Sequence, residues 1–159
     1  MQIEVDPVWG VFRGAETFDS FKENFVFKFK SEGLPKDVHK RLSVIQKVLE
    51  YSYFKYDFID IAFVQLLILL EKCTKGKYEL VERLPSKKKT FHQLIEWLDE
   101  KGYFQNRDKQ IVNFLREYRN EQVHDAKFQA GGLILFKMIK KVASLIEYIS
   151  NSSDALGKK

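Results

Sequence analysis

The sequence predicts an all-α protein, a helical bundle of five to six helices with an N-terminal extension that is irregular or forms short β-structure. Only three prolines and eight glycines interrupt the 159 residues, whereas a β-sandwich needs turn residues every 8–12 positions or so. Apolar residues recur at spacings of three and four over most of the chain after Gly33, as in helices that bury one face. The chain is long enough for one domain with a real core, and we expect residues 1–159 to form it.

The N-terminal third carries the weakest signals. Residues 1–14 show little periodicity and are expected to be irregular. Aromatic residues then recur every three or four positions over residues 15–31, which favours a helix, although residues 25–30 also alternate as a strand would. We treat residues 1–50 as an elaboration on a helical core over residues 56–150.

Two helices are expected next. Pro35 suits the first position of a helix that extends to about residue 53. Residues 56–74 form a second helix, which is apolar nearly all round between residues 61 and 70 and so is expected to lie at the centre of the bundle. Gly76 is expected to end it, because glycine is favoured just past a helix C-terminus.

Three further helices follow an exposed connection over residues 78–89. Thr90 is a good N-cap for a helix that stops near Gly102. Another begins at about residue 107 and sets Ile111, Phe114, Leu115 and Tyr118 at core spacing, and a last one covers residues 133–150. Residues 151–159 are expected to fray.

Composition narrows the classes of function. Lysine and arginine exceed the acids by 27 to 22, and the sequence pI near 9.1 suits a polyanionic partner. The single cysteine, Cys73, has no partner for an internal disulfide or a thiolate zinc site, which fits a reducing cytoplasm. The acidic start does not resemble a secretion signal and no apolar stretch is long enough to span a bilayer, so we expect no membrane partner.

Most catalytic motifs are missing from the sequence. It has no glycine-rich phosphate loop, no histidine pair at metal-ligand spacing and no serine in a nucleophile elbow, so no cofactor and no metal are expected. Asp57 and Asp60 are interpreted as a solvated or capping pair at a helix start. His39 and His92 each follow a helix start and are expected to lie in a first turn or at the surface.

One motif remains. Arg119 is followed by Asn120 and, five positions after the arginine, by His124, at the end of an amphipathic helix between a short helix and a final long one. This Arg-x4-His pattern and helix order resemble the HEPN superfamily of small helical domains, many of them ribonucleases. Positions five apart point about 140° away from each other on one regular helix, so Arg119 and His124 do not converge within a single chain without help. A two-fold homodimer would bring two copies of the motif together, as the resemblance implies.

The resemblance implies a metal-independent endoribonuclease that cleaves RNA through its own 2′-hydroxyl. His124 can take or give a proton near neutral pH. Arg119 can hold the scissile phosphate and stabilise the charge of the transition state. Asn120 can orient the imidazole or donate to the phosphate. The resemblance also implies a prokaryotic toxin or antiviral defence protein restrained by an antitoxin or regulatory protein, but Ala126 stands where a toxin subgroup has a tyrosine that its partner modifies.

Basic residues near the motif complete the predicted site. Arg116 precedes it, and Lys137, Lys140 and Lys141 form a strip on the last helix that can contact RNA phosphates. A charge run such as this, or residues 87–89, is also typical of a solvated helix face.

Two other interpretations stay open. In the first, the domain is a non-catalytic HEPN-like scaffold or regulatory module that binds RNA or a protein. In the second, the motif is accidental in a helical interaction domain: Arg119 pairs with a neighbouring glutamate and His124 faces the dipole at a helix C-terminus.

Overall fold

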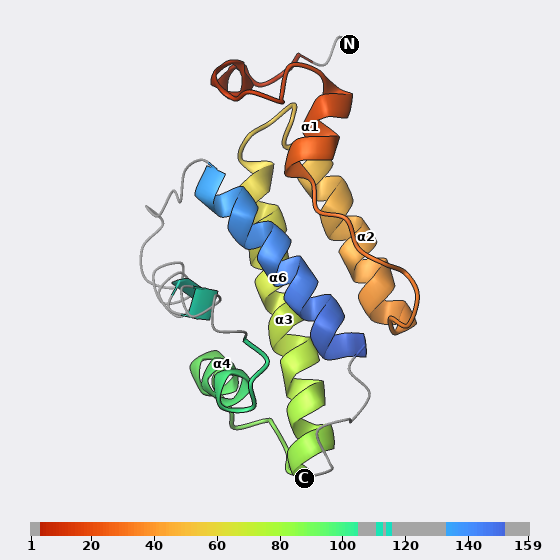
Figure 1. The fold of residues 1–159 in the computed structure, drawn as a ribbon, viewed down its shortest axis with the longest axis vertical. Coiled ribbons are helices and arrows are strands. Elements are labelled where there is room, and N and C mark those ends of the chain that lie inside the picture. Colours follow the sequence, from red (N-terminus) through yellow and green to blue (C-terminus); the bar gives the residue numbers. More distant parts are fainter. Residues whose placement is uncertain (1–3, 105–110, 113, 116–132, 152–159) are drawn as a thin grey trace.

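The computed structural model describes residues 4–104, 111, 112, 114, 115 and 133–151 (Figure 1). These residues contain helices and no strand, so the predicted all-α class is confirmed for them. The elements in chain order are the 3-10 helix η1 (Pro7–Val11) and the α-helices α1 (Phe18–Phe25), α2 (Lys36–Tyr51), α3 (Phe58–Glu82), α4 (Phe91–Glu100) and α6 (Leu133–Asn151). Residues 111, 112, 114 and 115 are helical as well.

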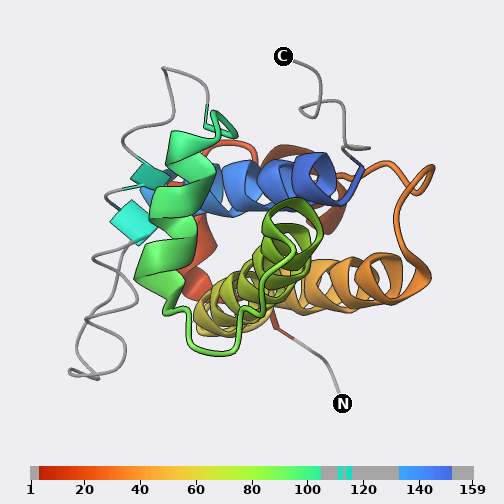
Figure 2. The ribbon, with the colours of Figure 1, turned by 90° about the horizontal axis from the view of Figure 1, so that it is seen from below.

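Helix α3 is the centre of the bundle. It packs against α2, α4 and α6, and α2 and α4 lie on opposite sides of the α3–α6 pair (Figure 1). Seen from below, α4 runs across the direction of α6 (Figure 2). The apolar stretch predicted to lie at the centre is buried on most of its faces, with Ala62, Phe63, Leu66 and Leu70 fully enclosed, whereas Ile61 and Ile68 are exposed. A helix that is apolar on most sides needs neighbours on most sides, which explains this arrangement.

The predicted end of α3 at Gly76 is wrong, because the helix continues through Gly76 to Glu82. Its C-cap is Arg83, whose φ of 55° is left-handed. The extra turns carry Tyr78, which is buried and meets the ring of Trp97 on α4 at 5.3 Å. Packing of this aromatic pair outweighs the roughly 1 kcal/mol by which glycine disfavours a helix interior.

The predicted start of α4 is confirmed. The Thr90 hydroxyl accepts a hydrogen bond from the Gln93 amide at 3.2 Å, and the Gln93 side chain accepts one from the Thr90 amide at 3.0 Å. This reciprocal capping box satisfies two amides that the first helical turn leaves unpaired. Gly102, with a φ of 76°, follows the helix end, as predicted.

The N-terminal residues pack into the same core as the later helices. Helix α1 covers only part of the predicted helix over 15–31, and the chain from residue 26 to residue 35 is irregular. The Trp9 indole donates to the Ser52 carbonyl at 2.9 Å, and its ring lies 4.7 Å from Phe21 and 5.6 Å from Phe136 of α6. Residues 4–35 therefore extend the core of the bundle.

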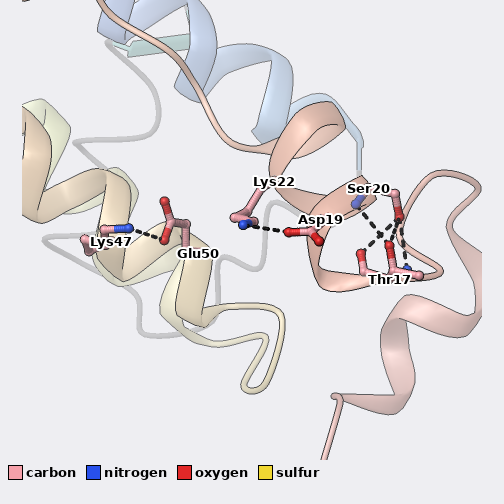
Figure 3. A network of polar contacts seen from close by, with 6 residues as sticks. All are labelled: Thr17, Asp19, Ser20, Lys22, Lys47 and Glu50. Carbon is pink, nitrogen blue, oxygen red and sulfur yellow. Dashed lines mark hydrogen bonds and ion pairs between the residues drawn. The ribbon is translucent and has the colours of Figure 1, made fainter.

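Charged and hydroxyl side chains order the exposed start of α1 and the neighbouring surface of α2 (Figure 3). Thr17 and Ser20 form a capping box. Lys22 pairs with Asp19 at 2.8 Å, and the hydrogen bond to that carboxylate raises the pKa of Lys22. Lys47 and Glu50 make a similar pair on α2 at 2.7 Å. Such exposed pairs contribute little to stability, so α1 is held mainly by its buried aromatic residues.

Candidate functional site

The predicted motif lies outside the described residues. This applies to Arg116, Arg119, Asn120 and His124, as well as to Ala126. Their roles therefore stay predictions.

The helical residues just before the motif are anchored in the core. Ile111, Val112 and Leu115 are buried, and the ring of Phe114 lies 6.1 Å from that of Phe63 in α3. This agrees with the core spacing predicted for Ile111, Phe114 and Leu115. The chain thus enters the motif from a point fixed against the central helix.

The three lysines of the predicted RNA-binding strip on α6 have different surroundings. Lys137 and Lys141 are exposed, whereas Lys140 is half-buried. The Lys140 ammonium donates a hydrogen bond to the Asn24 carbonyl near the end of α1. Burial lowers the pKa of Lys140, and the positive charge of Lys28 lowers that pKa further. Lys140 thus joins α6 to α1, and Lys137 and Lys141 are the exposed lysines of the strip.

A pocket of about 440 Å³ opens beside this strip. One wall comes from the chain after α4 and from the anchored segment, and the other comes from α6. Tyr103, Phe104 and Ile111 line the first wall, and Lys141, Ser144 and Tyr148 line the second. Lys140 and Lys141 both line the pocket on the α6 wall. Two lysine side chains thus border the pocket, which favours an anionic ligand.

Four aromatic rings connect the pocket to the core. Tyr148 of α6 meets Tyr103 with the centroids 5.9 Å apart, Tyr103 meets Trp97 at 5.9 Å, and Trp97 meets Tyr78 of α3 at 5.3 Å. The Trp97 indole also donates to Glu82 at 2.8 Å. Tyr103 is only 6% exposed, whereas 56% of Tyr148 is exposed. The buried rings therefore hold Tyr148 in place at the pocket mouth.

Tyr103 and Tyr148 were not among the residues predicted from the sequence. A signal for Tyr148 was present: Lys137, Lys141, Ser144 and Tyr148 recur at spacings of four, three and four, which places them on one face of α6. All four are exposed. Tyr103 carried no such signal, because it follows the end of α4 in a segment without periodicity.

The lysines at positions 87–89 do not all face solvent. Lys87 and Lys88 are exposed, but the ammonium of Lys89 lies over the Tyr78 ring, 5.3 Å from its centroid. Nearby, the Ser86 amide and hydroxyl donate to Glu79 at 3.0 and 2.6 Å. These contacts tie the connection to α3.

The other titratable candidates are exposed or half-buried. His39 is half-buried, with Nε2 3.2 Å from the Ser31 hydroxyl, and His92 pairs with Glu96 at 3.1 Å on α4. Asp57 occupies the N-cap position of α3 without a capping hydrogen bond from its side chain, and it pairs with Lys55 at 3.2 Å. Burial raises the pKa of Asp60, and the charge of Asp57 raises it further.

Two kinds of site are missing from the described part of the chain. Within it, no three histidine, cysteine, aspartate or glutamate side chains gather as a metal site would require. Nor does any helix there have the length and apolar character needed to cross a membrane.

Comparison with known proteins yields no match to a family model, a curated protein or a solved structure. The HEPN resemblance accordingly rests on the Arg119 and His124 motif and on the order of the helices.

Proposed function

We propose that this protein is a metal-independent endoribonuclease of the HEPN type that acts as a homodimer. The proposal is supported by the position of the helical residues that precede the motif in sequence. Ile111, Val112 and Leu115 fix that entry point in the core, and Ile111 also lines the pocket that Lys141 borders. Arg119 follows Leu115 by four positions and His124 follows it by nine, so the motif begins close in sequence to a pocket bordered by lysines, which suit a polyanion.

The proposed reaction uses groups that RNA and the protein already contain. His124 takes the proton of a ribose 2′-hydroxyl, whose oxygen attacks the adjacent phosphorus. The bond from phosphorus to the 5′-oxygen breaks, and His124 of the partner subunit gives that oxygen a proton. Arg119 stabilises the added negative charge on the phosphoryl oxygens, and Asn120 orients the imidazole or donates to the phosphate. The products are a 2′,3′-cyclic phosphate and a 5′-hydroxyl.

The proposed homodimer would bring arginine and histidine side chains of two copies into one cleft. On a single regular helix, residues five apart such as Arg119 and His124 would point about 140° apart, and two copies related by a two-fold axis would bring both groups together. We place this activity in the cytoplasm, in a toxin or defence protein restrained by an antitoxin or other regulator. The defence role and the regulator rest on the HEPN resemblance alone.

The proposal is tested by incubating the purified protein with RNA in excess chelator. Wild type should cleave the RNA, and Arg119→Ala and His124→Ala should each lose cleavage while keeping the helical circular-dichroism spectrum of wild type. His92→Ala is a matched control, because His92 lies on α4 in a surface pair with Glu96 and should be dispensable. Intact RNA with folded wild type would overturn the nuclease proposal.

A non-catalytic RNA- or protein-binding module is the second candidate. It is favoured by apolar side chains exposed on the outer surface of the bundle, among them Val44 of α2 and Ile61 and Ile68 of α3. Large exposed apolar residues are typical of interaction surfaces when they are contiguous. Binding of RNA without cleavage in the same assay would support this module.

A further inference from the structure

The pocket beside α6 has a cationic end and an aromatic end. Lys141 and Tyr148 are seven residues apart on α6, about two helical turns, so their side chains leave the helix on nearly the same side. The separation along the helix axis is about 10 Å at 1.5 Å per residue. Both residues line the pocket, and its volume of about 440 Å³ lies within the range of small-ligand sites.

Tyr148 is suited to stack on a flat ligand. More than half of its surface is exposed, yet its ring is held by an edge contact with Tyr103, which is buried and meets Trp97. A ring that is both exposed and held in place loses little conformational freedom when a base stacks on it. Aromatic side chains of this kind are the usual platforms for the bases of single-stranded nucleic acids.

Lys141 is suited to hold an anion at the other end. Its side chain is exposed, and it lines the pocket next to Lys140. Ser144 lies between Lys141 and Tyr148 on the same face and offers a hydroxyl to a sugar or a phosphate oxygen. This order of groups along α6, cation then hydroxyl then aromatic ring, matches the phosphate, sugar and base of one nucleotide.

We propose that this pocket binds one nucleotide of a single-stranded RNA, with its phosphate at Lys141 and its base stacked on Tyr148. The inference rests on the proposed ribonuclease function for the identity of the ligand, and it assigns the strand-binding site of that enzyme. Stacking and phosphate contacts do not require a 2′-hydroxyl, so DNA of the same sequence should bind to this pocket without being cleaved.

The test measures binding in a background that cannot cleave. A short fluorescein-labelled oligouridine is titrated with the full-length His124→Ala protein, and fluorescence anisotropy gives the affinity. Adding Tyr148→Ala should weaken binding by about five- to a hundredfold, the effect of losing one stacked base. Tyr148→Phe keeps the ring and should keep the affinity. Lys141→Gln should weaken binding and reduce the slope of log affinity against log salt by about one.

Matched controls come from the opposite side of the bundle. Tyr51 and Lys40 are exposed on α2, and Tyr51→Ala and Lys40→Gln should leave the affinity unchanged. Because Tyr148 and Lys141 are exposed, their substitution should not disturb folding, which circular dichroism checks.

The outcomes distinguish a failure of the pocket proposal from a failure of the nuclease proposal. If Tyr148→Ala and Lys141→Gln bind the oligouridine as tightly as their parent, the pocket proposal is overturned whatever the cleavage assay shows. It is also overturned if the parent binds no oligouridine. If the parent binds, Tyr148→Ala loses affinity and wild type leaves RNA intact, the pocket is supported and the nuclease proposal fails.

Discussion

The carboxylate of Asp6 accepts a hydrogen bond from the Tyr56 amide at 2.8 Å, across 50 residues of sequence. Its other oxygen accepts from the Val8 amide at 3.1 Å, and the Asp6 amide donates to the Tyr53 carbonyl at 3.0 Å. One residue thus fastens the N-terminal segment to the turn between α2 and α3. The Tyr56 hydrogen bond is the main reason that the pKa of Asp6 lies below its usual value, and the Val8 hydrogen bond adds to it.

Replacing Asp6 by asparagine removes the charge and one of the two acceptor oxygens. We expect Asp6→Asn to lower the free energy of unfolding by about 1 kcal/mol at neutral pH, a charged hydrogen bond discounted for solvent exposure. The folded-state pKa of Asp6 is depressed, so its contribution is present above the unfolded pKa of about 3.9 and is lost as pH falls through the folded value. The difference between wild type and Asp6→Asn should therefore shrink in acid, as urea unfolding at several pH values would show.

Asp57→Asn is the control for this experiment, because that carboxylate is exposed and its ion pair with Lys55 is exposed as well. Its free energy of unfolding should stay close to that of wild type at every pH. Equal effects of the two substitutions would show that the Asp6 hydrogen bonds do not fasten the segment.

Phe21 tests whether the N-terminal third belongs to the core. It is fully buried between Trp9 and Phe136 of α6. Phe21→Ala should lower the free energy of unfolding by about 3–5 kcal/mol, the usual cost of emptying a buried phenylalanine site. Val11→Ala, at a side chain that is 83% exposed, should change it by less than about 0.5 kcal/mol. Guanidinium unfolding measures both, and a small effect of Phe21→Ala would mean that residues 4–35 are peripheral.

Gly76 tests the course of α3. It lies inside the helix, and a Cβ atom added there would meet nothing within 4 Å. Gly76→Ala should therefore raise the free energy of unfolding by about 0.5–1 kcal/mol, measured by thermal or urea unfolding. A loss of stability would instead indicate that the helix ends at Gly76 in a left-handed conformation.

Gly33→Ala should instead lower the free energy of unfolding. Its φ of 83° is left-handed, and an added Cβ would come within 3.0 Å of the Asn151 side-chain oxygen. Alanine in that conformation is strained, so this variant should be less stable than wild type. The same substitution at Gly76 and at Gly33 should therefore change the free energy of unfolding in opposite directions.

The homodimer can be tested without RNA. Sedimentation equilibrium should give a mass that rises toward twice 18.8 kDa as protein concentration increases. A mass that stays at one chain over the whole concentration range would remove the composite cleft and, with it, the proposed pairing of Arg119 and His124.

The sequence predicted best the helices whose signals are local. The start of α4 was identified correctly because Thr90 and Gln93 form a cap within a few residues, and α2 and α6 were identified from the period of their apolar residues. The end of α3 was predicted wrongly because its stability depends on Trp97, which is distant in sequence. Trp9 could not be placed, since an aromatic residue without periodic neighbours does not indicate what it packs against.

In the candidate site, too, features with a local signal were predicted and those that depend on distant contacts were not. Lys137, Lys140 and Lys141 were recognised as a strip on one helix, but the engagement of Lys140 with Asn24 depends on how α1 packs against α6. The pocket likewise depends on the meeting of Tyr103 with Tyr148, which only the tertiary structure brings together. Arg116, Arg119, Asn120 and His124 lie outside the described residues, so their arrangement stays a prediction.

The central claim is that RNA is cut by its own 2′-hydroxyl. The most direct measurement compares two oligonucleotides of one sequence, RNA and its 2′-O-methyl analogue, incubated with the purified protein in excess chelator and analysed by mass spectrometry. We expect the RNA to yield fragments with 2′,3′-cyclic phosphate and 5′-hydroxyl ends while the methylated strand stays intact. Cleavage of the methylated strand, or RNA fragments with 5′-phosphate ends, would contradict it.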